Sequence, residues 1–250
     1  MTLQIRPDVA SLKYSDGIAA SRTMLALTAN RGALERRLPD EWELAPYAGD
    51  DLRGKSLREA NVLVPFHEVY GVRTRDGHAN GMSQMSYVVF ISQARHRTTG
   101  ALTHIHWFTY TEDPSAVPGK YRDAALAQIT RSQTFSKVNR GETRVREFVR
   151  AHGQNGLIEL SLEYVQGGQL VWATADQPNL ELRGANDMNV IRWYREDQVM
   201  DVVRSDPLGV NRVSEIALRV EGELSDVFDG NERVVAVVIQ RPYMRQVYVP

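Results

Sequence analysis

The chain has 250 residues, of which 42% are hydrophobic and 24% are charged, and its formal net charge is -1. These values are typical of an ordinary globular protein, and the balanced charge argues against a general nucleic-acid binder, whose affinity comes from an excess of Lys and Arg. The absence of cysteine excludes disulfides, thiolate metal sites and cysteine nucleophiles.

The beginning of the chain, MTLQIRPDVASLKYSDG, carries scattered charges and no apolar stretch, so it does not resemble a secretory signal. No apolar run approaches the ~18 residues that a membrane-spanning helix needs. We therefore expect a cytoplasmic protein that interacts with neither membranes nor nucleic acid.

Strand-like segments recur along the chain. They are rich in apolar, β-branched and aromatic residues and cover residues 23–28, 61–65, 85–92, 103–109, 156–164, 188–194, 214–221 and 234–240. Residues 156–164 alternate cleanly, with Ile158, Leu160, Leu162 and Tyr164 on one face, as in a half-buried antiparallel strand. Residues 165–173 follow across Gly167 and Gly168, and this pattern predicts a hairpin.

Helices are predicted at only two places. Residues 32–37 form a short helix that ends before Pro39. A second helical stretch is predicted from about Arg122 to Thr130. The sequence shows no repeat and no linker, so we expect a single domain over residues 1–250, of the mostly β (α+β) class, with a central helical insertion.

Three stretches, in the same order along the chain, resemble the acetoacetate decarboxylase superfamily. They are SRTMLALTANRGALERRLPDEW from Ser21 to Trp42, SLREANVLVPF from Ser56 to Phe66, and FSKVNRGETRVREFVRAHGQNGLIELSLEYVQGG from Phe135 to Gly168. The closing residues, from Gly222 onward, are similar in layout to the last strands of that family. The resemblance implies an antiparallel β-barrel or cone with a few short helices.

The same resemblance implies a chemistry and a set of site residues. Lys137 falls at the family's Schiff-base lysine, Glu59 at its active-site glutamate, and Arg22 near an arginine that holds a substrate carboxylate. A lysine that condenses with a keto acid turns a high-energy enolate into a neutral enamine. The implied protein is a Schiff-base lyase for a small keto acid, acting by decarboxylation or by pyruvate aldol condensation and dehydration, without a cofactor and as a homo-oligomer.

Lysine is scarce in this chain and occurs only at Lys13, Lys55, Lys120 and Lys137. Arginine cannot serve as an amine nucleophile at neutral pH, so only these four residues qualify. Phe135 and Val138 flank Lys137 and would supply apolar walls that favour its neutral amine. Lys120 is the second candidate nucleophile.

A histidine pair stands out at His104 and His106. Alternate residues of a strand share a face, so both imidazoles are expected to line the substrate pocket. A metal site is the alternative interpretation, but the pair lacks a matched third ligand, and we expect no metal. Gly-x-Ser-x-Gly and nucleotide-binding glycine patterns are absent.

A second hypothesis assumes the same fold but a function that does not depend on a lysine. In it the chain is a binding protein, or a cyclase or isomerase, for a hydrophobic biosynthetic intermediate, and the aromatic run His104 to Tyr110 lines its cavity. A large apolar pocket with Lys137 outside it favours this hypothesis. A small polar pocket that contains Lys137, Glu59 and an arginine favours the lyase.

Overall fold

A computed structural model describes residues 8–48, 55–76, 78, 84–115, 121, 123–168 and 170–250, and the side chains of residues 171–174 lie outside the description. The elements are η1 (Val9–Ser11), β1 (Lys13–Thr28), α1 (Arg31–Glu35), β2 (Trp42–Leu44), β3 (Val62–Thr74), β4 (Met85–His96), β5 (Leu102–Thr111), β6 (Ala124–Asn139), β7 (Glu142–Gly153), β8 (Gly156–Gln166), β9 (Leu170–Thr174), β10 (Leu180–Gly184), β11 (Ile191–Ser205), β12 (Val210–Asn211), β13 (Val213–Gly222) and β14 (Arg233–Val249).

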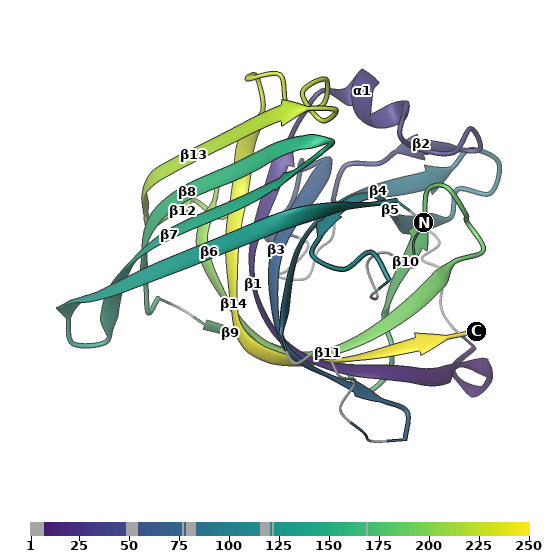
Figure 1. Ribbon diagram of the computed structural model, residues 1–250, viewed down its shortest axis with the longest axis horizontal. Helices are drawn as coiled ribbons and strands as arrows, with labels where there is room; N and C mark the ends of the chain where they lie inside the picture. Colours follow the sequence, from purple (N-terminus) through teal and green to yellow (C-terminus); the bar gives the residue numbers. More distant parts are fainter. Residues whose placement is uncertain are drawn as a thin grey trace.

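Seven strands form a closed barrel, in the order β5, β10, β11, β14, β1, β3 and β4, with β4 pairing back to β5. All these pairs are antiparallel except β5 with β10, which run parallel. Closure leaves the ring without a free sheet edge, which protects its backbone hydrogen bonds. The barrel lies at the right of Figure 1. The mostly β class and the barrel architecture are thereby confirmed.

An outer sheet continues from the barrel through β6, which pairs parallel to β5 over three residues and then antiparallel to β7. β8 and β13 complete this sheet. The hairpin of β6 and β7 projects away from the barrel, and its tip lies at the far left of Figure 1.

The two faces of the barrel strands pack against different surroundings. On β1, Leu25 and Leu27 belong to the large core between the barrel and the outer sheet. Ile18 and Ala20 belong to a smaller cluster inside the barrel, which contains four tyrosines. Because strand side chains alternate between faces, the same strands that build the core also line the barrel interior.

Most predicted elements are present. The short helix is α1, capped by the Asn30 side chain, which accepts from the Ala33 amide at 3.1 Å. On β8, Ile158, Leu160, Leu162 and Tyr164 are buried as the alternation predicted. Predicted strands generally fall within longer observed ones, such as residues 234–240 within β14.

Two predictions of local structure are wrong. The expected helix after Arg122 is strand β6, in which Ala125, Ala127 and Ile129 are buried and alternate with exposed residues. Its alanines favour a helix locally, but pairing with β7 and burial of one face outweigh that preference. The expected hairpin across Gly167 is also wrong, because β8 pairs with β7 and β13, and β9 pairs with β11.

No helix within the described part of the chain is long and apolar enough to cross a membrane.

Candidate functional site: a charged pocket inside the barrel

A pocket occupies the interior of the barrel, and every one of the seven ring strands contributes to its wall. The lining residues are Arg22, Pro65, His67, Tyr87, Val89, Ile91, His106, Tyr121, Leu180, Leu182, Tyr194, Glu196 and Arg245. The cavity volume is about 50 Å³. Since one water occupies roughly 10–15 Å³ on this measure, the cavity holds a few waters or a molecule of a few heavy atoms.

Arg22 is held on several sides by side chains inside the barrel. Its Nη1 and Nη2 donate to the two carboxylate oxygens of Glu196 at 3.2 and 3.0 Å, and Nη2 also donates to Gln198 at 3.2 Å. Its Nε donates to Gln240, and the guanidinium lies 5.0 Å from the centre of the Tyr243 ring. The positive charge of Arg22 is therefore balanced within the protein.

Arg245 is a second arginine in the same pocket, and its charge is not balanced in this way. It is 8% exposed, donates from Nη2 to the Tyr87 hydroxyl at 2.9 Å and stacks 4.9 Å from the centre of the Tyr194 ring. Its Nε is buried without a hydrogen-bond partner, and no carboxylate of the described chain lies within ion-pair distance of it. Arg245 is therefore a cation of the pocket wall that forms no ion pair with a described carboxylate. Burial lowers the pKa of its guanidinium, but the nearby tyrosines and Glu196 raise it by more.

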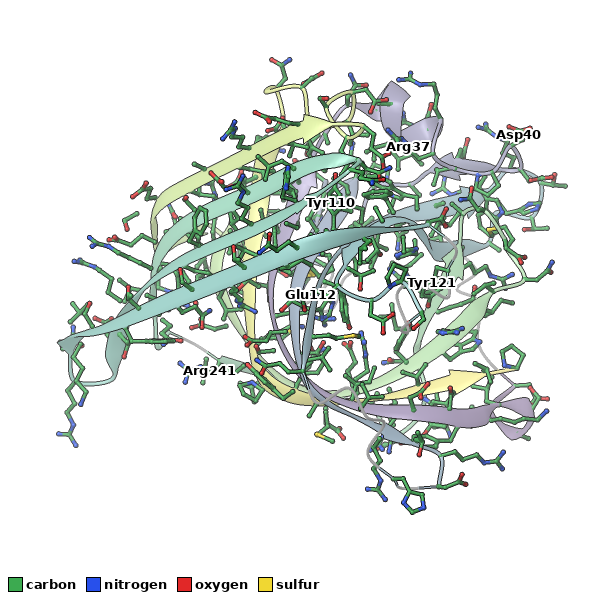
Figure 2. All side chains as sticks on the ribbon, viewed as in Figure 1. Arg37, Asp40, Tyr110, Glu112, Tyr121 and Arg241 are labelled. Atoms are coloured by element: carbon green, nitrogen blue, oxygen red, sulfur yellow. The ribbon has the colours of Figure 1, made fainter. Side chains whose placement is uncertain are left out.

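Two tyrosine hydroxyls meet in the pocket. The hydroxyls of Tyr121 and Tyr194 are 2.6 Å apart, and burial raises the pKa of both side chains. Both phenols therefore stay protonated at neutral pH; one hydroxyl donates to the other, which leaves the second hydroxyl proton to donate to a ligand. Figure 2 shows Tyr121 within the ring of barrel strands.

Two histidines of the pocket are neutral. Burial lowers the pKa of His106 to about 3. Burial, followed by the nearby charge of Arg22, lowers the pKa of His67 well below its usual range. The His106 ring stacks on Tyr121 at 4.6 Å, and its Nε2 is paired with the Thr109 hydroxyl. Its Nδ1 is buried and has no hydrogen-bond partner among the described residues.

The structure brings two of the predicted binding residues, Arg22 and His106, into the pocket wall. His104 does not line the pocket; it is half-buried, and its ring lies 5.7 Å from that of Tyr47. Within the described residues, no group of three or more His, Asp or Glu side chains is arranged to hold a metal ion.

The two predicted catalytic residues lie outside the pocket wall. Lys137 is exposed near the end of β6, opposite Thr143 on the projecting hairpin. Glu59 is exposed in a turn with a positive φ of 76°, and its carboxylate pairs with Arg233 at 3.0 Å. Their catalytic roles stay predictions, and the pocket geometry does not support them. Lys120, the second candidate nucleophile, lies outside the described residues.

Sequence reasoning missed most of the pocket. Tyr194, Glu196 and Gln198 alternate along β11, and Tyr243 and Arg245 alternate along β14. Polar residues at every second position of a strand between apolar neighbours indicate a polar interior face. On β11 the intervening residues Arg195 and Asp197 are charged as well, so this signal is absent there. No local pattern reveals that β11 and β14 face the same cavity.

No family model matches the sequence, and no curated protein is detectably similar to it by sequence. The fold, however, is that of the acetoacetate decarboxylase-like enzymes. An acetoacetate decarboxylase-like enzyme from Sphingomonas wittichii RW1 superimposes with a TM-score of 0.55 at 12% identity, over 95% of this chain and 90% of that chain. The enduracididine biosynthesis enzyme MppR, complexed with pyruvate, superimposes with a TM-score of 0.54 at 15% identity, over 94% of this chain and 87% of that one.

Proposed function

We propose that this protein is an enzyme that acts on a small keto acid inside the barrel, and that Arg245 holds the substrate carboxylate. The observation that carries the proposal is the buried Arg245 guanidinium, whose Nε lacks a partner and whose charge is not balanced by a described carboxylate. A guanidinium binds a carboxylate through parallel, charge-assisted hydrogen bonds. Burying a charge without a partner is unfavourable, so an anionic ligand stabilises the site.

The size and polarity of the pocket support a small acid. The volume of about 50 Å³ excludes a large hydrophobic intermediate. The Tyr121 and Tyr194 hydroxyls, which lie in the same wall, would donate a hydrogen bond to the keto oxygen. Donors placed where negative charge develops lower the barrier to forming an enolate or a carbinolamine.

Two chemistries remain candidates on this site. In the first, a lysine amine condenses with the keto group and releases water, and the resulting iminium accepts the electron pair left by loss of CO2 or of a Cα proton. The enamine formed in this way then takes up a proton or attacks the carbonyl carbon of an aldol partner. The fold shared with an MppR structure that contains pyruvate supports this class. In the second, the enzyme is lysine-independent, and the tyrosine hydroxyls alone stabilise an enolate. The observation that favours the second is that no lysine is among the described residues that line the pocket.

Borohydride trapping separates the two. The protein is incubated with pyruvate or acetoacetate, reduced, and analysed by intact mass and peptide mapping. A stable adduct on one lysine establishes the Schiff-base enzyme and identifies its nucleophile as Lys120, Lys137 or another lysine.

The lysine-independent candidate predicts saturable pyruvate binding without an adduct. If neither pyruvate nor acetoacetate binds to the protein or forms an adduct with it, the proposed function itself is wrong. The role of Arg245 is tested with Arg245→Met, which is expected to weaken pyruvate binding. Arg241→Met is the matched control, because Arg241 lies on the same strand and is exposed (Figure 2).

A further inference from the structure

A second cavity lies outside the barrel pocket, beside the end of α1. Its volume is about 390 Å³, and it is lined by Arg36, Arg37, Trp107, Phe108, Asp123, Ala124, Ala125, Asn155, Ala185, Asn186 and Glu223. Figure 2 labels Arg37 at this upper side of the molecule and Tyr121, of the barrel pocket, lower down. The volume falls within the ~300–1,000 Å³ that small-ligand sites occupy.

The two arginines of this cavity are already engaged. Arg36 and Arg37 both donate to the Asp226 carboxylate, at 3.1 and 2.9 Å. Arg37 also donates to the backbone carbonyl of Glu223 at 2.6 Å, and its guanidinium lies 5.8 Å from the centre of the Trp107 ring. These contacts hold Arg37 on three sides, whereas Arg36 is 67% exposed and is held only by Asp226, the carboxylate that both arginines share.

Asp123 is the buried acid of the cavity. It is 8% exposed, and its Oδ1 accepts a hydrogen bond from the Asn186 side chain. Its Oδ2 has only a long contact of 3.5 Å with the Asn186 amide. Among the described residues no cationic side chain forms an ion pair with it. Burial raises the pKa of Asp123 to about 6, so the carboxylate is largely ionised at neutral pH but poorly solvated.

We propose that this cavity is a binding site for a small organic ammonium ion, which pairs with the Asp123 carboxylate beside Trp107 and Phe108. An ammonium group provides the counter-charge that a buried carboxylate lacks. The aromatic side chains suit the aliphatic part of such a ligand. Glu223, at the same cavity, adds a second carboxylate.

The second site is separate from the barrel pocket and selects the opposite charge. Tyr121 lines the barrel pocket, and Asp123, two residues later, lines the second cavity. On β5, His106 lines the first and Trp107 and Phe108 line the second. The inference therefore does not depend on the keto-acid proposal.

Butylammonium and the neutral butan-1-ol are suitable probes, because they differ chiefly in the charge of the head group. Calorimetric titration of the full chain is expected to show saturable binding of butylammonium and markedly weaker binding of butan-1-ol. Asp123→Asn keeps an oxygen acceptor for Asn186 and removes the charge, so it is expected to weaken butylammonium binding roughly tenfold or more. Asp40→Asn makes the same change at an exposed position (Figure 2) and is expected to leave binding unchanged.

Equal affinity for the two probes, or unchanged butylammonium affinity in Asp123→Asn, would overturn the inference. If Asp123→Asn does not fold, carbodiimide coupling of butylammonium to the wild-type protein decides the question. Peptide mapping is then expected to find the amide mainly at Asp123. Labelling that is spread over exposed carboxylates, with no preference for Asp123, contradicts the inference.

Discussion

Arg22 and Glu196 form a two-pronged ion pair inside the barrel, with Nη1–Oε1 and Nη2–Oε2 distances of 3.2 and 3.0 Å. Both side chains are almost completely buried. The pair leaves Arg245 as the cation of the pocket that has no carboxylate partner among the described residues. The arginine predicted from the sequence to bind substrate thus pairs with Glu196, and under the proposed function Arg245 receives the anion instead.

Removing one partner of this pair is expected to destabilise the fold. Glu196→Gln leaves the Arg22 charge buried and uncompensated, and we expect the free energy of unfolding to fall by roughly 3 kcal/mol or more. Urea unfolding measures it. Glu43→Gln is the control, because Glu43 is 38% exposed and pairs with Arg97 at 3.5 Å; its effect should stay below about 1 kcal/mol. Equal losses in the two variants would contradict this account of the pair.

Arg245→Met should separate ligand binding from stability. The variant removes the proposed carboxylate receptor, so pyruvate affinity should fall roughly 10- to 100-fold, as for a lost charge-assisted hydrogen bond. Stability should stay constant or rise, because a buried charge without an ionic partner is replaced by an apolar side chain. Calorimetry and urea unfolding test the two parts. Unchanged pyruvate affinity would remove Arg245 from the site.

The exposed positions of Lys137 and Glu59 give a third prediction. Lys137→Ala and Glu59→Gln are each expected to leave pyruvate affinity unchanged and to alter stability by at most about 0.5 kcal/mol, as surface substitutions usually do. The borohydride adduct, if one forms, should persist in Lys137→Ala. Loss of that adduct in the folded variant would restore Lys137 as the nucleophile.

Asp123 predicts a pH dependence of stability. Its pKa is about 6 in the folded chain against an ordinary value of 3.8, so between these values the folded state binds more protons than the unfolded state. Its contribution to the free energy of unfolding is therefore present below pH 3.8 and is lost as the pH rises through 6. At ~1.4 kcal/mol per pKa unit, the loss amounts to at most roughly 3 kcal/mol.

The measurement for Asp123 is the difference in unfolding free energy between wild type and Asp123→Asn across pH 4 to 7. The variant should lose less stability than wild type over this interval, because its side chain does not ionise. Parallel curves of unfolding free energy against pH for the two proteins would show that burial does not raise the pKa of Asp123.

Gly156 and Gly209 both have a positive φ, of 132° and 65°, but they differ in the space that surrounds them. A Cβ at Gly156 would collide with the Glu221 carbonyl on β13, whereas one at Gly209 meets nothing within 4 Å. Gly156→Ala should therefore reduce stability by well over ~1 kcal/mol, and Gly209→Ala by only about that much, from backbone strain. Thermal unfolding of both variants checks the difference.

The sequence by itself determined the local features that depend on near neighbours. The alternation of β8, the short helix capped by Asn30 and the strand-rich composition could all be read from it, because side-chain period and capping are local properties. The motifs also led to the correct fold. Of the predicted binding residues, Arg22 and His106 lie in the wall of the barrel pocket, and their role in binding stays a prediction.

Tertiary structure alone decided the rest. Ala125 and Ala127 lie in a strand because β5 pairs with the first, β7 pairs with the second, and both side chains are buried in the core. Glu196 meets Arg22 across 174 residues of sequence. Arg245 stands out as the proposed anion receptor because Glu196, Gln198 and Gln240 already bond to Arg22. A side chain's charge is fixed by its chemistry, but whether that charge is balanced depends on which distant strands close the barrel around it.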